Sequence, residues 1–309
     1  MEEEVYRNSG IDKRELKALS RRSDAKGLLQ LARHLGLLSV TGAAVLLAGH
    51  PLVYAAALLG HGIALAFLFA PLHETIHRTA FESRWLNDGL ARICGLVLLL
   101  PPSYFRLFHF QHHRFTQDPE RDPELARPAI DSLRAYLLHV SGLPYWRERI
   151  GTLLKHALGR VDEGFIPARQ RREIANEARA YLAVYCLLAG ASLAAGSMLL
   201  LALWVLPLLL GQPALRLFLM AEHGGCPRSA DMLVNSRTTH TLRPLQWLSW
   251  NMNRHSAHHA YPAVPFHALP DADGMLAGQT VFRSEGYIEV HRALLAALWR
   301  RNAEQPAAF

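Results

Sequence analysis

The hydrophobic positions of this chain gather in two long stretches that contain no charged residue. Residues 35–72 and residues 180–215 lack Asp, Glu, Lys and Arg altogether. A helix needs roughly 20 apolar residues to cross the hydrocarbon core of a bilayer, so each stretch is about two membrane spans long. Each stretch also has a break near its middle, at Gly49-His50-Pro51 and at Ala195-Gly196-Ser197. The pattern therefore predicts two membrane hairpins, with spans at approximately 33–49, 52–72, 180–195 and 198–215.

A third apolar run, over residues 93–105, is too short to cross a bilayer and is interrupted by Pro101-Pro102. It predicts an interfacial or re-entrant helix. Very apolar core helices of a soluble protein are the alternative, but such helices normally keep one polar face, which these stretches lack. We expect an all-α integral membrane protein, with four transmembrane helices in two hairpins and a cytoplasmic helical cap.

The basic residues predict the orientation. All 33 Lys and Arg lie outside the two charge-free stretches, and the hairpin turns carry none. The positive-inside rule then places the N-terminus, the central region and the C-terminus in the cytoplasm. We expect a cytoplasmic segment over 1–34, a membrane domain over 35–270 and a second cytoplasmic segment over 271–309.

Composition narrows the class of protein further. Half of the 309 residues are hydrophobic and only 19% are charged, which excludes a disordered chain. Three scattered cysteines support neither a disulfide framework nor an iron–sulfur cluster. The net charge of +7 suits anionic lipid headgroups first and an acidic redox partner second. No basic–aromatic pattern calls for nucleic acid.

Histidine is the unusual residue of the composition, with 17 copies that are partly clustered. Residues three or four apart share one face of a helix, so each cluster presents its imidazoles in one direction. The predicted topology puts every cluster on the cytoplasmic side of the membrane. The clustered residues are His73, His77, His109, His112, His113, His223, His255, His258 and His259. The other eight are expected to have ordinary structural roles: His34, His50, His61, His139, His156, His240, His267 and His291.

Nine imidazoles gathered in one place would repel one another if protonated, whereas neutral imidazoles are metal ligands. Imidazole suits Zn, Cu, Fe and Ni. Structural zinc takes four ligands and catalytic zinc usually three protein ligands. Nine histidines therefore fit two metal ions of four or five ligands each, and two redox-active irons with open positions are the better match.

Two other functions are compatible with part of this pattern. His73-Glu74-Thr75-Ile76-His77 matches HExxH, the motif of zinc proteases in which the Glu is the general base. It would need one zinc and leaves the later clusters unexplained. A metal transporter is the other alternative, but transport sites normally lie near the bilayer midplane rather than after the spans. Two irons, one zinc or exchangeable metal in the purified protein would distinguish the three.

The order and spacing of the clusters resemble the membrane fatty acid desaturase/hydroxylase superfamily, the integral membrane di-iron oxidases with three histidine boxes. The boxes match as HxxxH at His73 and His77, HxxHH from His109 to His113, and a late HxxHH from His255 to His259. The two-hairpin layout and a proline at Pro262 after the last box also match. His223 is similar to the ninth ligand of acyl-CoA desaturases. Those enzymes have Asn one turn earlier, where this chain has Leu219; Glu222 and Asn251 are possible substitutes.

The resemblance implies O2-dependent attack on an unactivated C–H bond of a fatty acyl or related lipid chain by a centre of two Fe ions. Formation of a double bond is the outcome that we favour, and hydroxylation or ketone formation in the same superfamily is the alternative. No dinucleotide-binding fingerprint is present, so a separate electron donor is expected, a ferredoxin or a cytochrome b5-like protein.

Four acidic residues lie close in sequence to the expected ligands. Ligating histidines usually donate their second N–H to a carboxylate or a carbonyl, which makes these residues candidates for that role. The segment 117–123 is also consistent with a plain polar loop with two turns. The candidates are Glu74, Asp118, Asp122 and Glu124.

Overall fold

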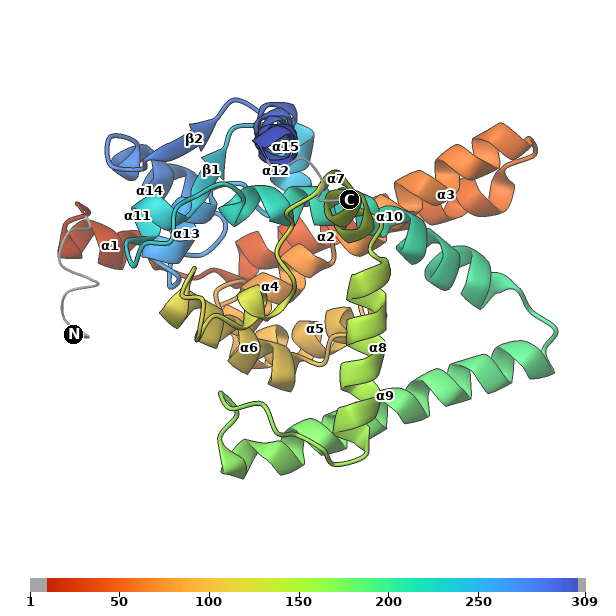
Figure 1. The fold of residues 1–309 in the computed structure, drawn as a ribbon. Coiled ribbons are helices and arrows are strands. Elements are labelled where there is room, and N and C mark those ends of the chain that lie inside the picture. Colours follow the sequence, from red (N-terminus) through yellow and green to blue (C-terminus); the bar gives the residue numbers. More distant parts are fainter. Residues whose placement is uncertain (1–9, 305–309) are drawn as a thin grey trace. The chain divides into compact units, whose positions relative to one another are not determined.

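The computed structural model describes residues 10–304, so the predicted terminal segments 1–34 and 271–309 lie partly outside the described residues. Within this part the chain is helical apart from two three-residue strands, β1 (Arg237–Thr239) and β2 (Phe282–Ser284), which pair in parallel (Figure 1). The prediction of an all-α protein is confirmed. The chain divides into two compact units. Unit 1 comprises residues 1–22, 110–141 and 216–309, and unit 2 comprises residues 23–109 and 142–215.

Unit 2 contains the most apolar helices and the first histidine box. Its elements are α2 (Asp24–Leu47), α3 (Pro51–Ala66), α4 (Phe69–His77), α5 (Arg84–Val97), α8 (Leu143–Ala157), α9 (Ala168–Ala194) and the π-helical turn η2 (Leu201–Val205).

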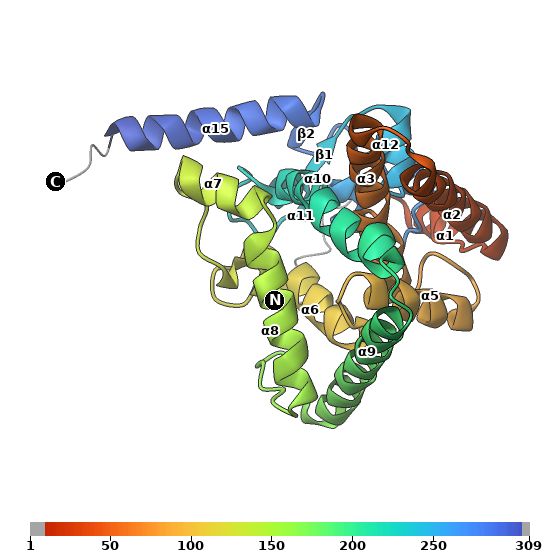
Figure 2. The ribbon, with the colours of Figure 1, turned by 90° about the vertical axis from the view of Figure 1, so that its right-hand side faces the viewer.

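Unit 1 contains the two strands and the last histidine box. Its elements, besides the strands, are α1 (Lys13–Leu19), the 3-10 turn η1 (Pro123–Ala126), α7 (Leu133–Val140), α11 (Met232–Asn235), α12 (Arg243–Leu248), α13 (His255–Ala260), α14 (Leu269–Leu276) and α15 (Tyr287–Glu304). Two helices, α6 (Pro102–Phe115) and α10 (Leu206–His223), run from one unit into the other. In Figure 2, α15 is a long straight helix, and α7 packs beside it.

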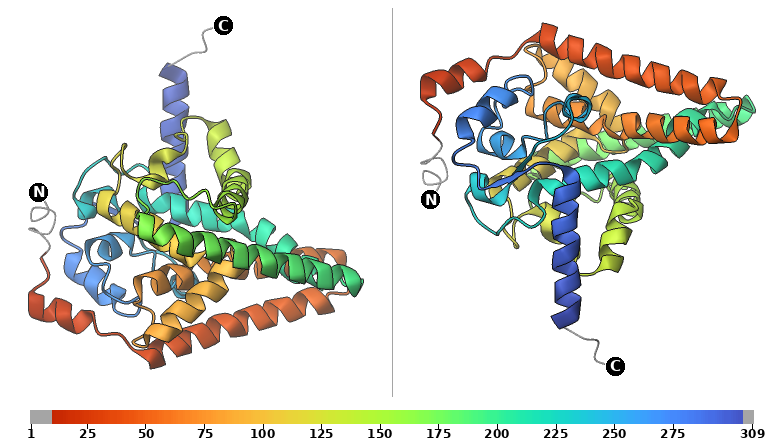
Figure 3. Two further views of the ribbon diagram at one scale, coloured as in Figure 1. Left: turned by 90° about the horizontal axis from the view of Figure 1, so that it is seen from below. Right: turned by 90° about the horizontal axis from the view of Figure 1, so that it is seen from above.

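The first pair of predicted spans corresponds to α2 and α3, which lie side by side (Figure 3). Ser23 caps the start of α2, and a turn at residues 48–50 precedes Pro51, which suits the first turn of a helix. Leu47 and Leu52 near this turn are 82% and 75% exposed. Apolar side chains exposed to this extent on long apolar helices are typical of a surface that faces lipid.

Within residues 10–304, three helical stretches are long and apolar enough to cross a membrane: Asp24–Leu47, Pro51–His77 and Leu201–His223. They match three of the four predicted spans with shifted ends. Prediction placed the fourth span at 180–195, which is the last part of the 27-residue helix α9; the first part of α9 is charged. Within unit 2, α9 packs mainly against α8, while η2 packs against α2 and α3.

The segment 93–105, predicted as an interfacial or re-entrant helix interrupted by Pro101-Pro102, spans the junction of two helices. These helices, α5 and α6, meet at a bend of 98°. Leu99 has a left-handed backbone (φ 55°) between them, and Pro101-Pro102 starts the second helix. The prolines remove backbone donors, so a helix cannot run through this point. A bent apolar pair of this kind is a broken span or a re-entrant loop.

One helix crossing in unit 2 depends on glycine. Gly62 on α3 lies against the carbonyl of Pro207 on α10, and Gly211, one turn later on α10, lies against the backbone of Gly62. A Cβ atom at either glycine would overlap these backbone atoms. Small residues allow membrane helices to approach closely, which gains van der Waals contact between their backbones.

Candidate metal centre

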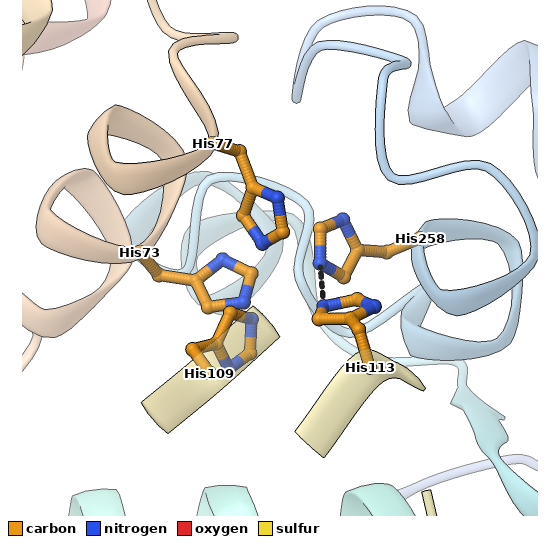
Figure 4. A group of neighbouring side chains, drawn as sticks. All are labelled: His73, His77, His109, His113 and His258. Atoms are coloured by element: carbon orange, nitrogen blue, oxygen red, sulfur yellow. Dashed lines mark hydrogen bonds between the residues drawn. The ribbon is translucent and has the colours of Figure 1, made fainter. Parts of the chain in front are cut away.

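In unit 2, the first histidine box forms a compact trio with His109. His73 and His77 lie on one face of α4, as their spacing of four predicts. The ring of His109 on α6 has its centroid 4.4 Å from that of His73 and 4.9 Å from that of His77 (Figure 4). His73 and His109 are almost completely buried. The helix ends at Arg78, whose left-handed backbone (φ 60°) stops α4 directly after the second histidine.

In unit 1, four histidines from three helices form a second group. His112 lies on α6, His223 ends α10, and His255 and His259 share one face of α13. The Nε2 atom of His223 lies 3.2 Å from Nε2 of His112 and 3.0 Å from Nε2 of His255. The ligand atoms of all four lie within 4.8 Å of one another.

The opposite ring nitrogen, Nδ1, of each of these four histidines lies next to an oxygen. Asp122 lies 3.0 Å from Nδ1 of His112, and the carbonyl of Asn235 lies 3.1 Å from Nδ1 of His223. The hydroxyl of Thr116 lies 3.2 Å from Nδ1 of His259, and a carboxylate oxygen of Glu222 lies 3.3 Å from Nδ1 of His255. An oxygen at Nδ1 fixes the ring orientation and leaves Nε2 for a metal ion.

The remaining two box histidines also pair within unit 1. His113 on α6 and His258 on α13 have their Nε2 atoms 3.1 Å apart, as the dashed line in Figure 4 marks. His113 also stacks on His259, with ring centroids 4.1 Å apart. The structure thus orients all of the unit 1 box histidines toward one another.

The geometry of unit 1 fits a metal ion better than a purely hydrogen-bonded core. Two imidazole nitrogens bound about 2.1 Å from one metal ion lie roughly 3.0–3.4 Å apart. The Nε2–Nε2 distances of 3.0–3.2 Å fall in this range. Among the described residues, the buried Nε2 of His259 has no hydrogen-bond partner. Burial and the neighbouring His113, His255 and His223 hold the pKa of His259 well below its ordinary value, so its imidazole is neutral and able to ligate.

The four acidic candidates from the sequence have different positions. Asp122 makes the contact that the predicted role needs, because its carboxylate lies against Nδ1 of His112 and also accepts hydrogen bonds from the backbone N–H groups of Gln117 and Glu124. The Glu124 carboxylate lies 3.8 Å from the same His112 nitrogen. Asp118 instead pairs with Arg121 in the loop.

Glu74 is buried in unit 2, where its carboxylate accepts a hydrogen bond from the Thr79 hydroxyl at 2.8 Å. Of the two possible substitutes for the missing Asn, Glu222 contacts His255, while Asn251 donates to the carbonyl of Phe266.

Two orienting residues were missed by the sequence analysis, Thr116 and Asn235. Thr116 follows His112 by one helical turn, so its spacing was a usable signal. Asn235 acts through its backbone carbonyl, which no residue type reveals.

Several histidines outside the boxes have ordinary partners, as expected. Each forms a hydrogen bond with a backbone carbonyl: His34 with that of Ala64, His61 with that of Leu203 and His291 with that of Leu217.

Long apolar helices and histidine groups that could hold metal ions define the class, a membrane protein with clustered histidines. The family model described as fatty acid desaturase matches residues 9–290. The chain therefore belongs to the fatty acid desaturase family, whose members are oxidoreductases that use iron and act on lipids in the membrane.

Two curated relatives share local similarity with this chain. An sn-1 oleoyl-lipid 12-desaturase from Picosynechococcus sp. is 26% identical over 92 residues, which is 28% of this chain and 26% of that protein. An sn-1 oleoyl-lipid 12-desaturase from Arthrospira platensis is 34% identical over 61 residues, which is 20% of this chain and 17% of that protein. The matched stretches thus span about a quarter or less of these relatives.

Proposed function

We propose that the nine box histidines hold two Fe ions. The quartet of unit 1, which comprises His112, His223, His255 and His259, would hold one ion. We assign the other five box histidines to the second ion, as the pattern of the sequence favours. The continuous helix α6 supports this division, because His109 and His113 are four residues apart and share one face. His112 directly precedes His113 and therefore points in a different direction from His113, so α6 would contribute to both sites.

We infer that the reaction is the O2-dependent introduction of a double bond into a fatty acyl or related lipid chain. Bound iron would supply the oxidation that removes hydrogen from an unactivated C–H bond. The chain's own residues would bind and orient this centre: Asp122, Thr116, Asn235 and Glu222 set the imidazole rings, and their burial excludes bulk water. The two relatives, both sn-1 oleoyl-lipid 12-desaturases, favour a lipid-linked acyl chain as the substrate.

The observation that carries this proposal is the anchored quartet of unit 1. Four histidines from three helices bring their ligand atoms within 4.8 Å of one another, and Nδ1 of His112, His223 and His259 shares a hydrogen bond with an oxygen. A hydrogen-bonded core has no need for this division of roles between the two ring nitrogens. A metal centre requires it.

The membrane arrangement belongs to the same proposal. We place the metal centre and both termini of the 35–270 membrane domain on the cytoplasmic side, with two helical hairpins crossing the bilayer. The electrons would come from a separate protein, a ferredoxin or a cytochrome b5-like donor. The basic residues outside the spans would attract an acidic donor.

Lipid profiling of cells with and without the chain, at controlled oxygen, tests the reaction. The proposal expects an oxygen-dependent unsaturated acyl product, which Asp118→Ala retains and both His112→Ala and His258→Ala abolish. A new hydroxyl group in place of a double bond would support the hydroxylase alternative. Full activity in both histidine variants would contradict the ligand assignment.

A further inference from the structure

Unit 2 contains a cavity of about 420 Å³ between α4, α5, α6 and α9 that the proposed reaction does not use. Thr75 and Ile76 line it from α4, and Arg106 and Leu107 line it from α6. On α4, Thr75 lies two positions from both His73 and His77 and therefore points to a different side of the helix from these histidines. The cavity therefore lies behind the first histidine box.

Four arginines line this cavity: Arg78, Arg84, Arg92 and Arg106. Three carboxylates accompany them, so the formal charge of the lining is +1. Asp88 already pairs with Arg78 at 2.9 Å and with Arg84 at 3.4 Å. Glu177 accepts the backbone N–H of Ser103 at 2.9 Å, and Glu173 the Ser103 hydroxyl at 3.4 Å. Arg92 in turn donates to the backbone carbonyl of Asp88 at 3.3 Å, and the lining keeps a formal excess of one positive charge.

Guanidinium groups match phosphate and carboxylate oxygens, to which they donate in a bidentate fashion. The volume falls in the range of pockets that hold small ligands or headgroups. The surroundings of the cavity favour a lipid headgroup over a soluble anion as the source of such a group. Trp85 and Ile93 on α5 are 74% and 63% exposed, and Trp85 shares a face with Arg92 seven residues later. An exposed Trp beside arginines is typical of the membrane–water interface, where lipid phosphates lie.

We propose that this cavity binds the phosphate group of an anionic membrane phospholipid, with Arg92 and Arg106 as its principal ligands. The Arg78–Asp88 ion pair forms one wall. Arg78 directly follows His77, and Arg106 precedes His109 by one turn, so a bound headgroup would also hold the two helices of the histidine trio in place. The site is independent of the reaction at the metal centre.

Titration of the full-length, iron-loaded protein in neutral detergent tests the site. The probes are dihexanoyl phosphatidylglycerol, dihexanoyl phosphatidylcholine and inorganic phosphate, with intrinsic Trp fluorescence as the readout. We expect saturable binding of phosphatidylglycerol, at least tenfold weaker binding of the other two probes, and at least a tenfold loss in the variant Arg92→Gln/Arg106→Gln. The control pair Arg171→Gln/Arg172→Gln, exposed on α9 outside the cavity, should bind as the wild type does.

Iron content and melting temperature show whether each variant is folded. If the double variant does not fold, the single variant Arg92→Gln replaces it, because Arg92 is exposed. Equal phosphatidylglycerol binding by wild type and the folded Arg92 variant would overturn the proposal. So would an equal loss in the control pair. If inorganic phosphate binds as tightly as phosphatidylglycerol, the site belongs to a soluble anion and the lipid assignment is overturned. Equal binding of phosphatidylcholine and phosphatidylglycerol would also overturn the lipid assignment.

Discussion

Single side chains around the quartet decide how firmly its imidazoles are oriented. Asp122 is 4% exposed and contacts His112 through both carboxylate oxygens, at 3.0 and 3.1 Å. Asp118, four residues earlier in the same loop, pairs with the exposed Arg121. These two residues therefore form a matched pair that differs in contact with a proposed ligand.

Asp122→Ala should lower the affinity of the protein for iron by about 10–100-fold, the usual effect of removing the partner of a ligating histidine. Competition with a graded iron chelator measures this affinity without reference to activity. Asp118→Ala should retain wild-type affinity. Equal chelator resistance of the two variants would show that Asp122 does not orient a metal ligand.

Glu163 gives a prediction for pH at the same scale. Burial alone would raise the pKa of Glu163, but hydrogen bonds from His156 and Lys155 lower it to about 2. A carboxylate whose pKa is lower in the folded state than its ordinary value of 4.5 stabilises the fold above pH 4.5. That contribution is lost as the pH falls from 4.5 toward 2.

The wild type should therefore melt at a higher temperature than Glu163→Gln at pH 6, and the difference should shrink below pH 4.5. Thermal melts of the purified protein in detergent, at steps from pH 6 to pH 3, check this. A difference that stays constant, or grows as the pH falls, would contradict the role given to the ion pairs of Glu163.

At the scale of helices, the α3–α10 crossing depends on the two glycines at their contact. Gly211→Ala would place a methyl group into the backbone of Gly62 and should cost about 1–3 kcal/mol of stability, as overpacking commonly does. Gly60→Ala on α3 meets no atom within 4 Å and serves as the control. Melting temperatures in detergent separate the two; similar values for both variants would mean that the helices do not cross this closely.

The membrane topology depends on whether helix α9 crosses the bilayer. Three other stretches have the length and hydropathy expected of a span, and α9 would be the fourth. His77 and His223 share one side of the membrane only if the chain crosses twice between them. Leu201–His223 supplies one crossing, and the apolar part of α9 would supply the other. We therefore expect Gly49 and Met198, in the two turns, to face the outside.

Single cysteines in a cysteine-free background test this topology in intact cells with a membrane-impermeant thiol reagent. Gly49→Cys and Met198→Cys should be labelled, whereas Glu120→Cys, beside the second box, should react only after lysis. Labelling of Glu120→Cys in intact cells would place the histidines on the outer side. Protection of Met198→Cys would remove α9 from the spans.

For the molecule as a whole, the grouping of the histidines was predicted from the sequence better than the bounds of the helices. Helical periodicity was enough to orient each histidine box, because spacing alone sets which residues share a face. The start of α2 at Asp24 was missed, since its first turns are polar although the helix continues into the apolar stretch. The interruption at Pro101-Pro102 was predicted, but the 98° angle between α5 and α6 was not.

Contacts that depend on tertiary structure could not be predicted from spacing. The carbonyl of Asn235 reaches His223 only because the chain after α10 turns back toward it, and Glu222 meets His255 from a distant segment. Likewise, no local pattern brings arginines from α4, α5 and α6 to one cavity. Residue types thus indicated the candidate ligands and Asp122, whereas the contacts of Asn235 and Thr116 required the fold.

The metal content of the full-length protein, purified in detergent without added chelator, tests the central claim most directly. Elemental analysis should find two iron atoms per chain. Replacement of His223 and His255 together by Ala should remove at least one of them, while Asp118→Ala should keep both. One zinc per chain, or iron content unchanged by the loss of these two histidines, would contradict a di-iron centre built from the nine histidines.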